Sequence, residues 1–388
     1  MKVLHVIDAL GLGGGAEHSL AELLPRLRER GVESAVATFV PRTGGLQQHL
    51  IDEGFDVEVL HSRTWPGRVR ELRRKFRREP PDLVHATLVN ACLTSRVAGL
   101  GTGIPQINSV VNTTYDPAKA QLTSIAPWKL RVLGTVDAFT LRHGVDHVHA
   151  ITDAVRDEVI DHLGRDPETV TVIPRGRSAT ALGGAGTARR DRVRADLGIA
   201  PDAVVVLNVG RQDPQKDQAG LVRAVAELAT THPHVELVIA GRAGSATADL
   251  DAAIASTGRS DNVRLLGHRD DVPDLLAAAD IFAFPSLYEG LGCVLIEAMA
   301  LETPIVGADA AAVAEVLEHG HLGEVVPRGD HRALADGIRR LVDDPGRRAE
   351  LAALGRARFL DRYELDRIAD ATVDLYRSVL GAERPSES

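Results

Sequence analysis

The sequence predicts an α/β protein built from two Rossmann-like domains that face each other across a cleft. The chain has 388 residues, more than one ordinary core needs and suited to two domains of conventional size. Short apolar segments alternate with helical ones along its length, which is typical of βαβ units with parallel strands. Residues 180–187 are small and lack hydrophobic periodicity. They indicate a linker between a domain over 1–180 and another over 181–360.

Two series of strands follow from the apolar runs, which are typical of strands buried on both faces of a parallel sheet. A helix over Ala16–Glu29, ended by Gly31, interrupts the first series. Strands of the first series are expected at Val3–Ile7, Ser34–Phe39, Val57–Leu60, Leu83–His85, Gln106–Val111 and His147–Ala150. Those of the second are expected at Val204–Val209, Val235–Ala240, Val263–Leu266, Ile281–Phe284 and Ile305–Val306.

Composition narrows the class of protein. A formal charge of -9 argues against a nucleic-acid binder, which needs a basic footprint. Only Cys92 and Cys293 are present, which excludes a disulfide framework and indicates a reducing compartment. The first strand starts at Lys2, leaving no room for a signal peptide, and no apolar run is long enough to span a bilayer. We therefore expect a cytoplasmic location.

The segment Ser286–Ala300 predicts a strand, a glycine-rich turn and a helix, placed after the apolar run that ends at Phe284. In an open α/β sheet, ligands bind where such strand ends meet helix N-termini. Glu289 falls in the turn, and Glu297 about two turns into the helix, from where its side chain can reach the crevice. The carboxylates suit sugar or ribose hydroxyls, and the amides from Leu291 to Val294 suit an anion. The alternative is two solvated glutamates.

A second strand end lies about eighty residues upstream. The apolar run Ala203–Val209 ends in Gly210-Arg211, with Lys216 in the same loop. Gly210 permits a close turn, and the two cations are placed to clamp a diphosphate. We expect both loops at one edge of one sheet. Cys293, beside the first loop, is better explained as a small buried residue than as a nucleophile.

The turn over residues 11–17 satisfies the G-x-G-x-x-A pattern of dinucleotide-binding folds. The acidic residue expected after the second strand is missing, because that strand ends at Val40 before Pro41. A nicotinamide oxidoreductase is therefore the poorer interpretation. A tight turn without ligand contact stays open as an alternative.

At these residues the chain resembles the retaining glycosyltransferases of family 4, which have the GT-B fold. The matching features run through nearly the whole chain. They are Gly210-Arg211 with Lys216, Pro285-Ser286, the pair Glu289 and Glu297, Glu297–Ala300 before Pro304–Val306, Val172–Gly176, Val263–Gly267, Leu275–Asp280, Gly323–Pro327 and Leu375-Tyr376. The resemblance implies an acceptor-binding domain over 1–180, a nucleotide-sugar-binding domain over 181–360, and over 361–388 a helix that crosses back to the first domain, then a short tail.

The same resemblance implies transfer of a sugar from a nucleotide diphosphate sugar to an acceptor hydroxyl, with retention of configuration. Arg211 and Lys216 would stabilise the leaving diphosphate in place of a metal ion, Glu289 would bind the donor sugar, and Glu297 the ribose. The donor site would consist of Gly14, Gly15, Gly210, Arg211, Lys216, Glu289, Gly290, Leu291, Gly292, Cys293, Val294 and Glu297. No metal is expected: the Asp-x-Asp at Asp249 and Asp251 falls in a polar helical segment.

One departure from the family concerns the acceptor side. Many relatives carry a histidine in the loop after the strand at Gln106–Val111, where this chain has Asn112, Thr113 and Tyr115. Amides and hydroxyls there can position a substrate but cannot act as a base at neutral pH. His85 matches another histidine of the family. Its catalytic role and a purely structural one both stay open.

A basic segment, Arg63–Arg78, contains eight cations, one glutamate and Trp65. A solvated helix face is the default interpretation, and peripheral contact with an anionic membrane is the alternative. Residues 125–133, with Trp128, are a second candidate for a cover over the acceptor side. Two other classes also stay open: a sugar-nucleotide epimerase of the same shape, and a non-catalytic nucleotide-sugar-binding protein.

Overall fold

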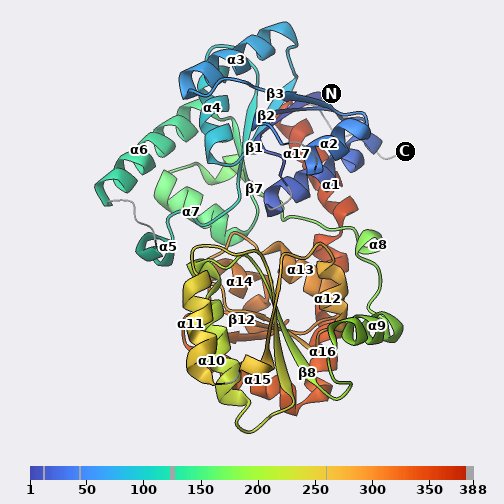
Figure 1. Cartoon of the computed structure of the whole chain (residues 1–388). Helices are drawn as coiled ribbons and strands as arrows, with labels where there is room; N and C mark the ends of the chain where they lie inside the picture. Colours follow the sequence, from blue (N-terminus) through green and yellow to red (C-terminus); the bar gives the residue numbers. More distant parts are fainter. Residues whose placement is uncertain (12–13, 43–44, 123–126, 259, 382–388) are drawn as a thin grey trace. The chain divides into compact units, whose positions relative to one another are not determined.

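The structure, a computed structural model, describes residues 1–11, 14–42, 45–122, 127–258 and 260–381 (Figure 1). The chain divides into two compact units. Unit 1 consists of Met1–Thr113, Ser124–Gly176 and Leu365–Ser388, and unit 2 of Thr114–Thr123 and Arg177–Glu364. Each unit is a Rossmann-like α/β layer structure with its own parallel sheet.

In the described part of unit 1, seven parallel strands pair in the order β3-β2-β1-β4-β5-β6-β7. Order reverses beside β1, as in doubly wound sheets. The strands are β1 (Lys2–Ala9), β2 (Glu33–Val40), β3 (Asp56–Val59), β4 (Leu83–Thr87), β5 (Gln106–Val110), β6 (His147–Ala150) and β7 (Val170–Val172).

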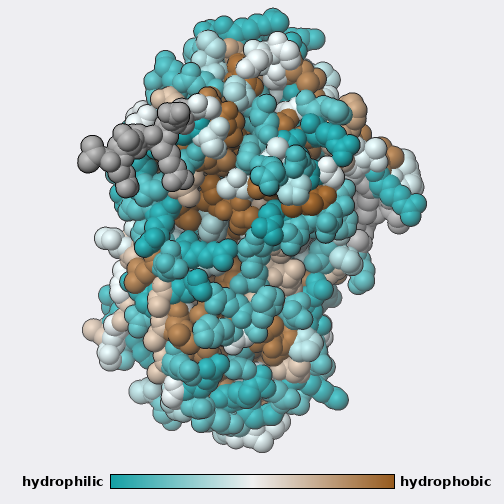
Figure 2. Space-filling view, turned by 180° about the vertical axis from the view of Figure 1, so that it is seen from behind, coloured by the Kyte–Doolittle hydropathy of each residue, from teal (hydrophilic) through white to brown (hydrophobic). Residues whose placement is uncertain are grey.

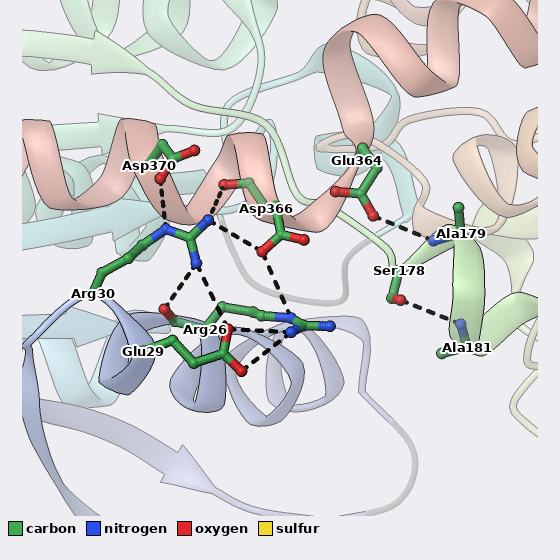
Figure 3. Close-up of polar contacts among 9 residues, drawn as sticks. All are labelled: Arg26, Glu29, Arg30, Ser178, Ala179, Ala181, Glu364, Asp366 and Asp370. Carbon is green, nitrogen blue, oxygen red and sulfur yellow. Dashed lines mark hydrogen bonds and ion pairs between the residues drawn. The ribbon is translucent and has the colours of Figure 1, made fainter.

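The helices of unit 1 complete the βαβ connections, and the last of them comes from the far end of the chain. They are α1 (Gly15–Glu29), α2 (Gly45–Asp52), α3 (Trp65–Arg78), α4 (Val89–Gly99), α6 (Pro127–Gly144), α7 (Asp153–Leu163), η1 (Pro167–Thr169) and α17 (Leu365–Val379). Buried Ile368, Val373 and Tyr376 of α17 share one apolar cluster with Val3 and Leu27. Arg30, which caps the C-terminus of α1, also donates to the carboxylates of Asp366 and Asp370 of α17 (Figure 3).

In the described part of unit 2, six parallel strands pair in the order β10-β9-β8-β11-β12-β13. The four residues of β11 are all buried, which explains their uninterrupted apolar sequence. The strands are β8 (Val204–Val209), β9 (Val235–Ala240), β10 (Val263–Gly267), β11 (Ile281–Phe284), β12 (Ile305–Ala308) and β13 (Glu324–Val326).

Some helices of unit 2 bury apolar side chains against this sheet in one cluster that includes Leu221, Val225, Ile338 and Leu341. The helices are α5 (Pro117–Leu122), α8 (Ala179–Leu182), α9 (Thr187–Leu197), η2 (Pro214–Lys216), α10 (Gln218–Leu228), α11 (Thr247–Thr257), η3 (Ser260–Asn262), α12 (Val272–Ala278), α13 (Cys293–Ala300), α14 (Ala311–Val316), η4 (Glu318–Gly320), α15 (His331–Asp343), α16 (Pro345–Arg358) and the π-helix η5 (Phe359–Tyr363).

Differences from the sequence predictions are local. Strands β7 and β13 were missed because three residues each are too few for a periodic signal. The predicted domain 1–180 is interrupted, because Thr114–Thr123 belongs to unit 2. The main passage to unit 2 lies between Gly176 and Arg177 and the return between Glu364 and Leu365, where 180 and 360 were expected. The stretch over 180–187 belongs to unit 2, where Ser178 caps the short helix α8 by accepting a hydrogen bond from Ala181 N.

Candidate functional site

The loops that follow β8 and β11 lie together at the carboxyl edge of the sheet of unit 2. The two strands are neighbours and run parallel, so their ends point the same way. Leu287 N donates to Gln215 O at 2.8 Å, and Gln215 Nε2 donates to Tyr288 O at 2.8 Å. The two motifs singled out in the sequence therefore form one continuous polar surface.

Lys216 and Glu289 form an ion pair between these two loops. A Cβ at Gly210 would come within 3.2 Å of Lys216 Cδ, so the glycine leaves room for the lysine stem. The ammonium lies 4.8 Å from the centroid of the Phe284 ring. The Lys216 and Glu289 side chains are only 18% and 10% exposed, and charges with so little water around them act strongly on a bound ligand.

The turn at the end of η2 determines where Lys216 points. Pro214 opens η2 with its fixed φ, and Asp217 ends it in the left-handed conformation at φ 42°, which Asp tolerates better than most residues. The Asp217 carboxylate then accepts a hydrogen bond from Gly220 N at 3.2 Å and caps α10. Burial raises the pKa of Asp217. Lys216 is thus held between a proline-initiated turn and a helix cap.

Arg211 is the more exposed of the two predicted cations. Its side chain is 56% exposed and pairs with Asp213, whose Oδ1 accepts from Ser245 N and Ser245 Oγ, both at 3.2 Å. A cavity of about 590 Å³ opens beside it, lined among others by Arg211, Asp213, Arg242, Ser245 and Tyr288.

Arg242 was missed in the sequence. It follows Gly241 at the end of β9, and the signal that would have found it is the same glycine-then-arginine pattern as at Gly210 and Arg211. Among the described residues no hydrogen bond or ion pair involves its guanidinium, although the Gln212 amide donates to its carbonyl oxygen. It adds a second guanidinium to the cavity wall.

The turn from Gly290 to Gly292 leads into α13. Gly292 has φ 77°, and a Cβ there would lie 3.0 Å from the Phe284 ring, so glycine is required both for conformation and for space. Leu291 is buried, and Cys293 and Val294 open the helix with partial exposure. The first-turn amides of a helix lack intrahelical partners and suit an anion.

Glu297 lies just over one turn into α13, because the helix begins at Cys293 rather than earlier as the predicted two turns require. Its Oε1 accepts a hydrogen bond from Arg177 Nε at 2.7 Å. The Arg177 side chain is 6% exposed and that of Glu297 16%. Arg177 was also missed, since it lies one residue past the motif Val172–Gly176 and 120 residues from its partner.

His85 is buried inside unit 1, with both ring nitrogens occupied. Nδ1 lies 2.7 Å from Tyr376 Oη, and Nε2 lies 2.7 Å from Ser109 Oγ. Ser109 Oγ also bonds to His149 Nδ1 at 2.8 Å. Burial lowers the pKa of His85 well below its usual value, so the ring is neutral. The network ties α17 to strands β4, β5 and β6.

The remaining predicted residues divide between the units. Gly14 and Gly15 start α1 in unit 1, next to residues 12–13, which lie outside the described part. Asn112 and Thr113 follow β5 in unit 1, and Tyr115 belongs to unit 2. Asn112 Oδ1 is buried without a hydrogen-bond partner among the described residues. The segment Thr114–Thr123 belongs to unit 2. It is held there partly by Asp116, which forms an ion pair with Arg328 at 3.3 Å.

The basic segment over Arg63–Arg78 forms α3, and several of its cations are already engaged. Lys75 is buried and pairs with Asp56, Glu58 and Glu79. Arg78 pairs with the last two of these, and Arg73 and Arg68 donate to carbonyl oxygens. Arg70, Arg74, Arg77 and Arg78 are nevertheless exposed, as the default interpretation of a solvated face expects. Lys75 differs because neighbouring strand β3 supplies carboxylates that the helix pattern alone does not reveal.

Metal ligands and membrane-spanning helices are the last two features to consider in residues 1–11, 14–42, 45–122, 127–258 and 260–381. No group of three or more histidine, cysteine or acidic side chains is placed there to hold a metal ion, and Asp249 and Asp251 are exposed on α11. No helix in that part of the chain combines the length and apolarity needed to cross a membrane.

Cations, carboxylates and helix amides at the carboxyl edge of a doubly wound sheet define the class of nucleotide-handling α/β proteins. Comparison with known proteins narrows the class. Residues 14–176 match the glycosyl transferase 4-like domain, and residues 189–358 match glycosyl transferases group 1. The chain belongs to this family of GT-B glycosyltransferases, family 4, and is an enzyme of the glycosyltransferase type.

Comparisons with individual proteins agree with this family assignment. The D-inositol 3-phosphate glycosyltransferase of Kineococcus radiotolerans is 31% identical over 97% of this chain and 94% of its own length. The alpha-maltose-1-phosphate synthase of Mycolicibacterium smegmatis is 30% identical over 78% of this chain and 80% of its own. The crystal structure of Anabaena HepE in complex with UDP superposes with a TM-score of 0.84, at 25% identity, over 97% of this chain and all of that one.

Proposed function

We propose that this enzyme transfers a sugar from a uridine diphosphate sugar to an acceptor hydroxyl, with retention of anomeric configuration. The observation that carries the proposal is the Lys216–Glu289 pair beside Arg211, at the edge where β8 and β11 end. The UDP complex of HepE supports uridine as the base. The names of the relatives favour a sugar-phosphate or glycosylated-metabolite acceptor, and they are transferases and synthases rather than epimerases or binding proteins.

The cations supply the main catalytic effect. When the glycosidic bond to the diphosphate breaks, negative charge grows on the leaving oxygens, and fixed cations stabilise that growing charge more than the charge already present. Lys216 is preorganised by Glu289 and the Phe284 ring. Arg211 is the adjacent cation, and Gly210 keeps the loop close. The first-turn amides of α13, with Gly290 to Val294, contribute further donors.

Each of the two carboxylates binds a different part of the donor. Glu289 accepts hydrogen bonds from the donor sugar while it holds Lys216 in place. Glu297 accepts from the ribose hydroxyls, and its orientation is set by Arg177 at 2.7 Å. A carboxylate fixed by a buried arginine keeps its second oxygen for a ligand.

In unit 1, Gly14 and Gly15 contribute the close approach of the first loop to the donor, and Asn112, Thr113 and Tyr115 belong to the acceptor side. The buried, unpaired Oδ1 of Asn112 supports a ligand donor there. Both ring nitrogens of His85 are occupied by Tyr376 and Ser109, so neither is available to a substrate. This supports a positioning role, in which His85 holds Tyr376 of α17 in place. The acceptor proton then passes to a leaving diphosphate oxygen on the same face as the departing group.

We extend the proposal to metal independence and to a cytoplasmic location. Protein cations at the diphosphate position support the first, and a content of two cysteines, Cys92 and Cys293, suits the reducing cytoplasm. Activity that survives EDTA is the expected result. Loss of activity with EDTA and recovery with magnesium or manganese would overturn metal independence and leave the sugar-transfer proposal intact.

A ligand screen tests the proposal directly. Thermal unfolding is followed with UDP, GDP, ADP and TDP, and products formed from the matching sugar nucleotides are identified by mass spectrometry with simple sugar phosphates as acceptors. A diphosphate at one hundred times its Kd stabilises the protein by about 2.7 kcal/mol. We expect UDP to give the largest shift. Equal shifts for all four, or none for UDP, would contradict uridine as the donor base.

A further inference from the structure

Helix α6 of unit 1 carries an apolar stripe on its outer face. Four large side chains, spaced at i, i+4, i+8 and i+11, lie within less than a quarter of the helix circumference. They are strongly exposed: Trp128 63%, Val132 54%, Val136 47% and Phe139 65%. Leu133, beside the stripe, is 55% exposed. In Figure 2, hydrophobic surface reaches the edge of unit 1 on the side where α6 lies. A contiguous exposed apolar patch marks an interaction site.

The opposite face of α6 fixes the direction of this stripe. Asp137 Oδ1 accepts from Arg96 Nη1 at 2.6 Å, and Thr140 Oγ1 bonds the same nitrogen at 3.0 Å. Leu141 is fully buried, and a Cβ at Gly144 would come within 3.1 Å of Arg96 Cβ. Because α6 is pinned to α4 along this side, its apolar stripe cannot rotate inward.

Outside the face that packs against α4, the charged side chains of α6 are all cations. Lys129, Arg131 and Arg142 are exposed and flank the stripe, and Asp137, paired with Arg96, is the only acid in the helix sequence. The Lys129 ammonium lies 5.6 Å from the Trp128 ring centroid. Apolar and aromatic side chains bordered by cations are the composition of helices that lie in the interface of an anionic membrane.

Comparison with α3 shows why α6 is the better candidate. On α3 the only strongly exposed apolar side chain is Trp65, at 46%, and Lys75 and Arg78 are paired with carboxylates. A second copy of this chain is also a poorer partner for the stripe. A two-fold contact there would bring the cations of both copies together, and Asp137, the only acid in the α6 sequence, is already paired with Arg96 on the opposite face.

We propose that α6 docks unit 1 on a membrane surface that contains anionic lipid. Trp128, Val132, Val136 and Phe139 enter the boundary between headgroups and acyl chains, and Lys129, Arg131 and Arg142 contact lipid phosphates. The acceptor-binding unit is thereby brought to the membrane surface. This inference concerns docking alone and does not depend on the identity of the donor.

Sedimentation with vesicles tests the proposal. The full-length protein should pellet with vesicles of equal parts phosphatidylglycerol and phosphatidylcholine, and less as salt rises. It should not pellet with phosphatidylcholine alone. Trp128→Ser combined with Phe139→Ser should abolish pelleting, and Lys129→Gln combined with Arg131→Gln should weaken it about fivefold per charge.

Matched variants on α3 are the controls: Trp65→Ser for the aromatic residues and Arg74→Gln with Arg77→Gln for the cations. We expect these to pellet like the unchanged protein. All variants should keep the same thermal midpoint and UDP affinity, because the altered side chains are exposed and lie outside unit 2. Absence of pelleting at low salt, equal pelleting with neutral vesicles, or loss only in the α3 variants would overturn the proposal. So would a dimer that Trp128→Ser with Phe139→Ser converts to a monomer without any vesicle binding.

Discussion

Unit 1 and unit 2 have the same kind of sheet but place their polar side chains in opposite ways. In unit 1, His85 and His149 are buried within the sheet and linked through Ser109, and Tyr376 closes the network from α17. In unit 2, Arg211, Lys216 and Glu289 stand at strand ends as ions. One unit thus uses polar groups to hold itself together, whereas the other keeps them where a ligand can arrive.

The difference follows from the cost of burying charge. A neutral imidazole can be buried if its nitrogens find partners, and burial lowers the pKa of His5 and of His149 to about 4. An ion buried without water costs several kcal/mol. Charged groups therefore collect at the edge of the sheet, paired with each other, and a ligand has only to compete with those pairs.

The largest expected effect is acid instability confined to unit 1. The pKa values of His5, His85 and His149 in the folded protein lie below their value near 6.5 in the unfolded chain. At a pH between the folded and the unfolded pKa, the unfolded chain therefore binds more protons than the folded protein does. The stability that these histidines contribute is full above about pH 6.5 and falls as the pH drops, by up to about 1.4 kcal/mol per pH unit for each histidine. For His5 and His149 the fall extends to about pH 4.

Hydrogen–deuterium exchange, corrected for intrinsic rates, separates the units: peptides from β4 should lose protection on acidification before peptides from β8. His5→Phe removes one titrating group and should reduce the pH slope by about one proton, or about 1.4 kcal/mol per pH unit. The exposed His61→Gln is its control. A simultaneous loss of protection in both units would break the comparison.

The next effect concerns the ions of unit 2. Arg211→Ala and Lys216→Ala each remove a charged contact worth about 1.5–3 kcal/mol, so turnover should fall about ten- to 150-fold. Initial rates and the thermal midpoint are measured together, with the exposed Arg332→Ala as a matched cation control. Full activity in both variants would show that these cations do not serve the diphosphate.

The smallest effect separates the two carboxylates. Glu297→Gln should weaken binding of free UDP by about tenfold, since its contact with the ribose is lost together with the charge that orients Arg177. Glu289→Gln should leave UDP affinity nearly unchanged and reduce sugar transfer. Calorimetric titration gives the affinities and steady-state kinetics the rates. Equal losses of UDP affinity would refute this division of roles.

Much of this architecture is readable from local sequence. The strands β8, β9 and β11 begin and end at the predicted residues, because a strand buried on both faces admits few polar residues. The two loops are recognisable from their glycines, since Gly292 has a positive φ and lies against the Phe284 ring, and a Cβ at Gly210 would crowd Lys216. Strand adjacency then brings the two loops to one edge.

Which side chains pair with each other was decided by the tertiary structure. Glu297 pairs with Arg177, 120 residues away, and His85 bonds to Tyr376, 291 residues away. Lys75 looks solvated in the pattern of α3 but is buried among carboxylates of β3 and its own helix.

By itself, the sequence determined which segments are buried, which loops are tight and which chemical groups are available, since these depend on hydrophobicity, backbone sterics and side-chain chemistry within a few residues. The tertiary structure decided which of those groups are neutralised and which stay open to a ligand or a membrane. Arg242 and the stripe on α6 belong to the second kind. A charge or an apolar side chain acquires its role from the neighbours that folding brings to it, and those neighbours lie far away along the chain.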